Sequence, residues 1–272
     1  MDTGSCIVCL SFDWDGETMW CGPGKPDSPS AESRGRYAAR VAVPRIEQML
    51  DDYGIKSTFF VPGHTASLHP EIVKRLHAKG HEIGHHNYYH EAAVSLGLDE
   101  ERAIMEKSSA VLVGITGEKP VGYRCPSWLT STHTMGLLSE YGFLYDSSMM
   151  DEEAPYTFEP ALGRAEMVEL PVAWELDDAP YFLFNFSPSY RAGMSSPDKV
   201  LDIWKTEFLA AYSTHHFFNL TMHPQVSGRS HRLLMVRELV EFMMSMANVR
   251  FMRCCDAASL VIRCNGRLGP NG

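Results

Sequence analysis

The feature that most constrains this 272-residue chain is a regular alternation of short apolar segments with amphipathic helical patterns. Strand-like segments are expected over 6–13, 57–63, 81–86, 121–126, 167–174, 181–186, 217–224 and 249–254. Helical patterns are expected over 37–54, 69–80, 99–117, 131–142, 196–213 and 231–248, with Asp99 as a cap. Such alternation is typical of parallel strands with crossover helices, and about seven or eight strands favour a barrel over an open sheet. The sequence therefore predicts one α/β domain over 1–272.

Polar residues with catalytic potential gather where the expected strands end. They are Asp13, Asp15, His64, His86, His90, Arg124 and His223. In β/α barrels the carboxyl ends of the strands form the active face, because the loops after the strands meet there. This placement predicts an enzyme.

Residues 14–36 show no clear period and read as one long loop. Loops of that length are uncommon in compact domains and are often functional. Trp14 and Trp20 lie in this loop and could form the wall of a pocket, although a solvated surface loop is an equal alternative.

Composition excludes several classes of partner. The formal net charge is −10, which disfavours binding to nucleic acid or to an anionic membrane surface. The chain shows no signal-peptide pattern and no apolar run of membrane-spanning length, so we expect a cytoplasmic protein. The cysteines, an odd number, form no disulfide framework. Cys6 and Cys9 could form a redox or zinc pair, but on a strand they would point to opposite faces.

His86 and His90 are candidate metal ligands. They are four residues apart, so on a helical turn they would share one face and could bind one ion. Asp13 or Asp15 could supply a carboxylate as the third ligand. Two histidines and one carboxylate leave a coordination position for water, which is typical of catalytic metal sites.

Four short motifs in order resemble the polysaccharide deacetylase superfamily, also called the NodB homology or carbohydrate esterase 4 fold. They are SFDWDG from Ser11, HNYYH from His86, RCP from Arg124 and LTMH from Leu220. The resemblance implies a distorted (β/α) barrel of the NodB type. It also implies metal ligands at Asp15, His86 and His90, a general base at Asp13, an arginine at Arg124 that pairs with this base, and a general acid at His223. A homo-oligomer, either dimer or tetramer, is expected from the same resemblance.

Several positions depart from the sugar-deacetylase pattern. Trp14 separates the two aspartates, and Ser127 and Trp128 follow the RCP motif where a tyrosine is usual. The AWELDD segment offers Glu175, Asp177 and Asp178 as candidate partners for His223, and the sequence does not choose among them. These departures resemble a cytoplasmic branch that includes peptidoglycan deacetylase-like proteins, cyclic imide hydrolases and allantoinases. Side chains expected to contact substrate are Glu17, Trp14, His64 and Trp174.

We therefore predict a metal-dependent hydrolase of non-peptide carbon–nitrogen bonds. The predicted reaction is ring opening of a small cyclic imide, ureide or related amide. The alternative is a de-N-acetylase of amino sugars. Zinc is the expected metal, with cobalt, nickel and manganese as alternatives. An inactive binding protein on the same fold is disfavoured by the intact set of candidate residues.

Overall fold

The computed structural model describes residues 5–25, 28–160, 166–184, 194–214 and 216–264. Strand β1 (Cys6–Asp13) lies at the centre of the molecule and is buried along its whole length. It pairs in parallel with β2 (Thr58–Val61), β8 (Phe217–Met222) and β9 (Val249–Phe251). Every residue of β1 is therefore covered by neighbouring strands or by the helices outside them.

The sheet continues outward from β2 in the order β3, β4, β5, β7 and β6. The bounds of these strands are Glu82–His85, Gly122–Tyr123, Tyr145–Asp146, Met167–Glu169 and Tyr156–Phe158. Only the β6–β7 pairing is antiparallel among the described residues. The predicted α/β barrel class is confirmed, with the sheet curved as a half-barrel of nine strands in place of about seven or eight.

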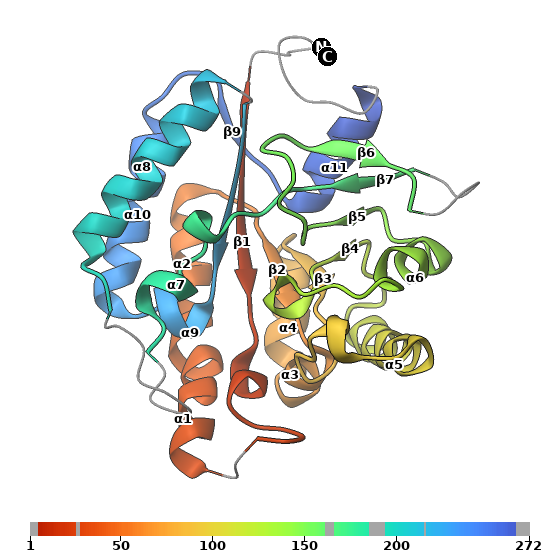
Figure 1. The fold of residues 1–272 in the computed structure, drawn as a ribbon. Helices are drawn as coiled ribbons and strands as arrows, with labels where there is room; N and C mark the ends of the chain where they lie inside the picture. The colour runs from red at the N-terminus through yellow and green to blue at the C-terminus, as the bar shows by residue number, and fades with distance from the viewer. Residues whose placement is uncertain (1–4, 26–27, 161–165, 185–193, 215, 265–272) are drawn as a thin grey trace.

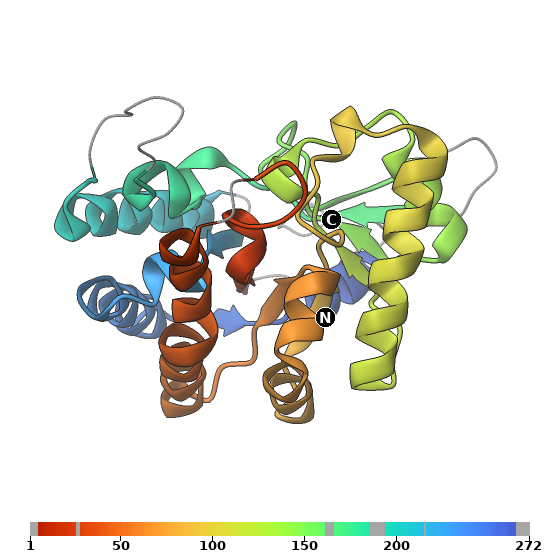
Figure 2. The same cartoon turned by 90° about the horizontal axis from the view of Figure 1, so that it is seen from below.

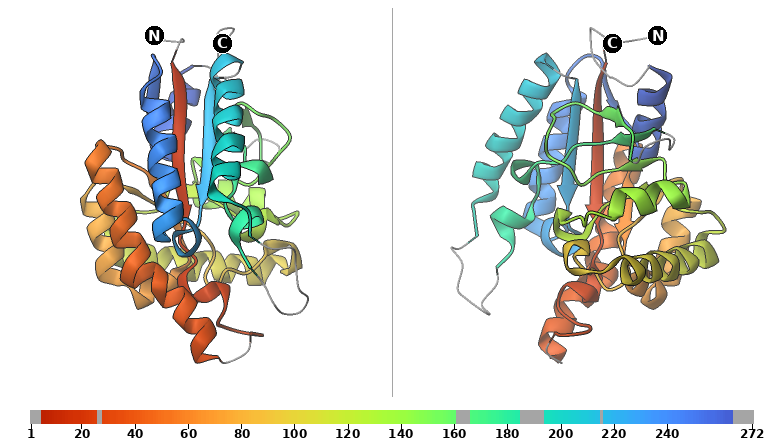
Figure 3. Two further views of the ribbon diagram at one scale, coloured as in Figure 1. Left: turned by 90° about the vertical axis from the view of Figure 1, so that its left-hand side faces the viewer. Right: turned by 45° about the vertical axis from the view of Figure 1, so that its right-hand side comes forward.

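Helices surround the sheet, as Figure 2 shows from below. Figure 3 shows α8 (Pro197–Ser213) and α10 (Ser230–Met244) packed along the side formed by β1 and β8. The remaining helices are α1 (Pro29–Tyr37), α2 (Val43–Tyr53), α3 (Gly63–Leu68), α4 (Pro70–Ala78), α5 (Leu98–Thr116), α6 (Thr134–Tyr141), α7 (Ala179–Phe182), α9 (Pro224–Ser227) and α11 (Cys254–Arg263). None of the helices in the described ranges has the length and apolarity needed to cross a membrane.

The two cysteines of β1 point to opposite sides of the sheet, as predicted. Cys6 packs in the main core with Val8 and Leu10, whereas Cys9 packs in a second core beside α11. The pair therefore does not form a two-cysteine metal or redox site.

Two predicted elements are wrong. Residues 181–186 were expected to form a strand, but α7 includes Tyr181 and Phe182, and residues 185–186 lie outside the described ranges. The Asp177 carboxylate accepts a hydrogen bond of 2.7 Å from the backbone N–H of Ala179, which starts a helical turn instead. Helix α5 begins at Leu98 after Gly97, so Asp99 lies in its first turn and is not its cap.

The segment 14–36 is also more ordered than expected. It contains a 3₁₀ turn at Gly16–Met19 and helix α1, whose cap Ser28 accepts a hydrogen bond from the backbone N–H of Ala31. Helix α1 shows no hydrophobic periodicity, because Gly35 is its only fully buried residue. A Cβ atom at Gly35 would lie 2.4 Å from the Cα of Glu17, so only glycine allows α1 to pack this closely on the turn after β1.

Candidate metal centre and catalytic site

The three predicted metal ligands come together at the carboxyl ends of β1 and β3. Asp15 lies two residues after β1, His86 directly follows β3, and His90 lies in the loop beyond. The backbone between the histidines is not the predicted helical turn. Asn87 and His90 have φ angles of 55° and 61°, and these left-handed residues fold the loop so that the two imidazole rings lie 5.1 Å apart.

The ligand atoms have the spacing that a small divalent ion requires. Asp15 Oδ1 lies 3.4 Å from His86 Nε2 and 3.6 Å from His90 Nε2. Ligands in a tetrahedral zinc site with bonds of about 2.1 Å are about 3.4 Å apart. Asp15 Oδ1 and His86 Nε2 are buried and have no hydrogen-bond partner among the described residues. Buried polar atoms without partners are rare, and a cation would satisfy both, so the residues fit a metal ion.

Neighbouring groups prepare these side chains to bind a cation. His86 Nδ1 lies 2.6 Å from the backbone oxygen of Arg124. Because a carbonyl only accepts hydrogen bonds, Nδ1 carries the proton and Nε2 keeps its lone pair for a metal. Burial lowers the pKa of His90 to about 4, which keeps this ring neutral. Burial alone would raise the pKa of Asp15, but His90 and His86 lower it below its usual range, so Asp15 is ionised.

Asp13 is held by Arg124, as predicted. Arg124 Nη1 donates to Asp13 Oδ1 at 2.8 Å and to Ser11 Oγ at 2.8 Å. Its Nη2 and Nε donate to the side-chain and backbone oxygens of Ser147, and its guanidinium stacks on the Phe60 ring at 4.3 Å. Burial alone would lower the pKa of Arg124, but the Asp13 carboxylate raises it, so this fully buried side chain remains charged. The other Asp13 oxygen lies 4.0 Å from His86 Nε2, within reach of the metal centre.

His223 approaches the centre from β8. Its Nε2 lies 3.8 Å from Asp15 Oδ2, and its Nδ1 donates to Asp178 Oδ1 at 2.7 Å. Asp178 Oδ2 accepts from the backbone N–H of His223 and from Ser227 Oγ. Asp177 Oδ1 is more distant from His223 Nδ1, at 3.5 Å. Burial alone would lower the pKa of His223, but the Asp177 and Asp178 carboxylates raise it well above its usual value.

A buried pair of carboxyl groups supports the outer strands near this site. Glu169 Oε1 accepts from the backbone N–H groups of Ser148 and Met149, and Asp146 Oδ1 accepts from Ser148 Oγ. The two carboxyl groups also interact with each other. Burial raises the pKa of Asp146 to about 6, and burial followed by repulsion from Asp146 raises the pKa of Glu169 further above its usual value. The pair therefore keeps a proton at pH values where ordinary carboxyl groups have already lost theirs.

The retained proton predicts how stability responds to pH. A carboxyl group whose pKa is raised by folding loses its contribution to stability as pH rises, because the unfolded chain binds fewer protons. Glu169→Gln keeps the acceptor oxygen for both backbone N–H groups and removes the titration. The free energy of unfolding of this variant, relative to the wild type, should rise by up to about 1.4 kcal/mol per pH unit between about pH 5 and the Asp146 pKa of about 6. Urea unfolding at several pH values across this range measures the difference. Glu100→Gln, exposed on α5, is the control, and a constant difference for Glu169→Gln would contradict the prediction.

The four expected substrate contacts are in different surroundings. Trp14 is fully buried, belongs to the main core and stacks on His69, so its side chain offers no surface to a substrate. Glu17 is also buried, and both of its carboxylate oxygens lie 3.1 Å from His69 Nε2. His64 packs on the tyrosines of the His86–His90 loop, with its ring 4.4 Å from that of Tyr89. Trp174 is 46% exposed and packs on Trp128.

One residue that contacts the candidate metal centre was not predicted from the sequence. Gln225, two residues after His223, donates from Nε2 to Asp15 Oδ2 at 3.2 Å and is almost fully buried. Its only signal is its position in a loop after a strand, which it shares with the predicted site residues. Ser11, Ser147 and Ser227 were also not predicted, although they orient Arg124 and Asp178.

Comparison with known proteins identifies the family of this chain. The family Polysaccharide deacetylase matches residues 34–145. A peptidoglycan deacetylase of Helicobacter pylori is 30% identical over 96% of this chain and 98% of its own length. A crystal structure of a candidate polysaccharide deacetylase from Mycobacterium smegmatis is 36% identical, with a TM-score of 0.91 over 96% of this chain and 92% of that one. The Puue allantoinase has the same fold, with a TM-score of 0.82 at 23% identity over 96% of this chain and 91% of that one. The chain therefore belongs to the polysaccharide deacetylase family, and with it to the hydrolases that act on carbon–nitrogen bonds.

Proposed function

We propose that this protein is a divalent-metal-dependent deacetylase that hydrolyses the acetamido group of an N-acetylated amino sugar. The main support is the buried group of Asp15, His86 and His90, which lies between two side chains able to transfer protons, Asp13 and His223. The relative from Helicobacter pylori, described as a peptidoglycan deacetylase, matches along nearly the whole of both chains and favours a sugar substrate.

Each side chain has a defined task in the proposed reaction. A divalent ion at Asp15, His86 and His90, for which zinc, cobalt, nickel and manganese all suit the ligand set, would supply a Lewis acid for the amide carbonyl and for water. Asp13 accepts a proton from water as its oxygen adds to the amide carbon. His223 then donates the proton on Nε2 to the departing nitrogen as the carbon–nitrogen bond breaks, which gives acetate and a free amine.

The surroundings of Arg124 and Asp177 provide a surface for a sugar ring. Trp128 lies in the turn after Arg124, and Trp174 lies three residues before Asp177. Their rings are 4.4 Å apart, and half of Trp174 is exposed. Ser127 and Trp128 both have positive φ angles, which is costly for residues other than glycine and is common at ligand sites. The indole of Trp174 offers a flat apolar face to a sugar bound with its acetamido group at the metal centre.

Ring opening of a small cyclic imide or ureide is a second candidate, and one observation favours it. The reacting side chains are buried except for His90, which is 14% exposed. A small cyclic amide could be enclosed entirely at such a site, whereas an oligosaccharide must extend out of it.

A substrate panel distinguishes the two reactions and gives the first test of function. Purified protein loaded with zinc is assayed on N-acetylglucosamine oligomers and peptidoglycan fragments for acetate release, and on succinimide and hydantoin for ring opening. We expect acetate release that a chelator reduces to the background rate and that added zinc restores, because Asp13 and His223 need the ion to activate amide and water. Ring opening without acetate release would instead support the second candidate and contradict the first.

A further inference from the structure

A second cavity, lined by aromatic and apolar side chains and by three arginines, lies beside the candidate metal centre and includes Gln225. The cavity has a volume of about 260 Å³ and collects side chains from distant parts of the chain. Those that matter here come from the start of the chain, from α7 and from the α9–α10 region: Trp20, Arg34, Phe182, Gln225, Arg229 and Arg232. Its position next to an aspartate ligand suggests that one molecule could reach both places.

Positive charge dominates this cavity in a protein with an overall charge of −10. Arg34, Arg229 and Arg232 line it, and its described lining contains no aspartate or glutamate. None of the three arginines forms an ion pair with a carboxylate in the described part of the chain. Each guanidinium instead stacks on an aromatic ring, at 4.5 Å, 3.7 Å and 4.5 Å respectively. Residues 185–193, which lie outside the described ranges, contain no acidic residue in their sequence.

The arginines keep hydrogen-bonding capacity that the protein does not use. Arg34 Nη2 donates to the backbone oxygen of Phe184, Arg232 Nη1 donates to that of Val226, and Arg232 Nη2 contacts Met194 Sδ at 3.1 Å. Arg232 is only 7% exposed, and its Nε is buried with no hydrogen-bond partner among the described residues. Burial lowers the pKa of Arg34 and of Arg232, and repulsion from Arg229 lowers both further, although the nearby Asp178 carboxylate raises that of Arg232. Among the three arginines only Arg232 is buried, and an anion beside it would reduce the cost of burying its charge.

Gln225 connects the cavity to the reaction centre. Its Nε2 donates to the Asp15 carboxylate, while its Oε1 is buried and has no hydrogen-bond partner among the described residues. Arg232 shares this neighbourhood, because Val226, which accepts its hydrogen bond, is the next residue after Gln225. A molecule in the cavity is therefore separated from the metal ligands by one side chain.

We propose that this cavity is a subsite for an oxyanion, a carboxylate or a phosphate, carried by the substrate whose amide lies at the metal centre. Guanidinium groups bind both anions through paired, charge-assisted hydrogen bonds. The substrate class is then an N-acylated compound that also carries an acidic group. This statement about the substrate rests on the proposed function, whereas the anion site itself does not.

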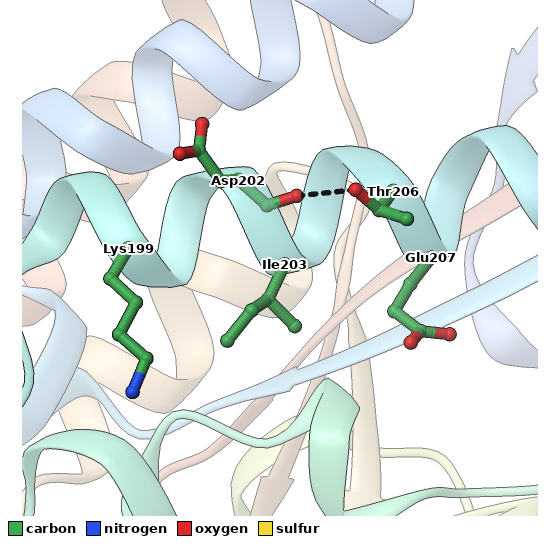
Figure 4. Close-up of a pocket in the computed structure, with 5 residues that line it drawn as sticks. All are labelled: Lys199, Asp202, Ile203, Thr206 and Glu207. Atoms are coloured by element: carbon green, nitrogen blue, oxygen red, sulfur yellow. Dashed lines mark hydrogen bonds between the residues drawn. The ribbon is translucent and has the colours of Figure 1, made fainter.

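Another hollow on the surface lacks the excess of positive charge that an anion site requires. On α8, a hollow of about 560 Å³ is lined by Lys199, Asp202, Ile203, Thr206 and Glu207 (Figure 4). Its one lysine is accompanied by two carboxylates, and Thr206 Oγ1 donates to a backbone oxygen of the same helix. Charges of both signs balance there, so the hollow has no preference for an anion.

Binding of small anions tests the subsite without any turnover. Zinc-loaded protein is titrated with succinate and, in a separate arm, with inorganic phosphate, by calorimetry. Arg34→Gln and Arg229→Gln should each weaken binding of the preferred anion about tenfold, and the double variant about a hundredfold. Arg250→Gln, an exposed arginine on β9 at the amino end of β1, is the matched control and should bind as the wild type does. Neither Arg34 nor Arg229 is fully buried, so we expect both variants and the double variant to fold.

Kinetics then connect the subsite to the substrate. For an N-acetyl sugar with a carboxylate substituent, the double variant should raise KM about a hundredfold with little change in kcat, and the neutral N-acetyl sugar should be unaffected. Equal anion binding by the wild type and the double variant would overturn the proposal, because the anion would then lie at the metal centre. Arginine-dependent binding by a protein that releases no acetate would retain the anion site and reject only the proposed function.

Discussion

Asp15→Asn is expected to abolish retention of zinc and to lower kcat/KM for acetate release by about 10³–10⁴, the largest effect of any single change considered. Asp15 supplies the only anionic ligand of the three, and its Oδ1 lies within 3.6 Å of both histidine nitrogens. An asparagine oxygen at that place carries no charge and binds a divalent ion weakly. Both the affinity for the ion and the activation that depends on it are therefore lost together.

Metal content and thermal stability measure this prediction separately from activity. Zinc at a hundred times its dissociation constant should stabilise the wild-type protein by about 2.7 kcal/mol and should not stabilise Asp15→Asn. Asp202→Asn, an exposed aspartate on α8, is the matched control and should keep both zinc and activity. If Asp15→Asn retained one zinc ion per chain with wild-type affinity, the assignment of the metal site would be wrong.

The sequence brings the candidate site residues to one place because strand ends meet at one edge of a parallel sheet. Asp13 ends β1 and Asp15 lies just beyond it, His86 follows β3, Arg124 follows β4, and these side chains lie close together in the structure. Strand β1 could be identified because it is buried and mostly apolar, whereas β3 carries Glu82 and His85 and β4 has two residues. The position of a residue relative to a strand end therefore identifies candidates for the site, although it does not separate them from residues such as His64 that pack elsewhere.

Sequence patterns do not predict the backbone conformation within the loops and short helices of the site. His86 and His90 do meet, but through left-handed residues in a loop and not on the helical turn that their spacing suggested. Spacing of four residues fits both arrangements, so the sequence alone cannot separate them. Helix α1 was missed for a related reason, because a helix that packs through one glycine has no apolar face to detect.

Contacts between distant polar residues are the least predictable part of the site. Gln225 and Asp15 are separated by 210 residues, and the arginines of the anion cavity come from segments almost as far apart. No pattern in the sequence connects such residues, because the local sequence around a polar loop residue does not show whether its side chain faces the site. Their role follows only from the hydrogen bonds and from the atoms that remain without partners.

The partner of His223 is a further contact that the sequence does not determine. The structure distinguishes the three candidates, Glu175, Asp177 and Asp178. Glu175 is exposed, and its backbone oxygen, not its carboxylate, accepts hydrogen bonds from Tyr181 and Trp204. Asp177 accepts a hydrogen bond from the backbone N–H of Ala179 just before α7, and burial raises its pKa to about 7, so part of it is neutral at physiological pH. Asp178 is fully buried and bonds to both the ring and the backbone N–H of His223.

Asp178→Asn is therefore expected to lower kcat by about 10²–10⁴, whereas Asp177→Asn should lower it less than about tenfold. An asparagine oxygen can still accept from the backbone N–H of His223, but its amide nitrogen then faces a ring nitrogen that must itself donate. That arrangement favours the wrong tautomer and no longer stabilises the protonated ring that His223 needs to protonate the leaving nitrogen. Asp177→Asn copies a neutral form that already exists near pH 7 and keeps the oxygen that accepts from the backbone N–H of Ala179. Because neither aspartate belongs to the metal centre, zinc content and KM should match the wild type in both variants. A loss of kcat in Asp177→Asn as large as in Asp178→Asn would show that the two carboxylates act on His223 together.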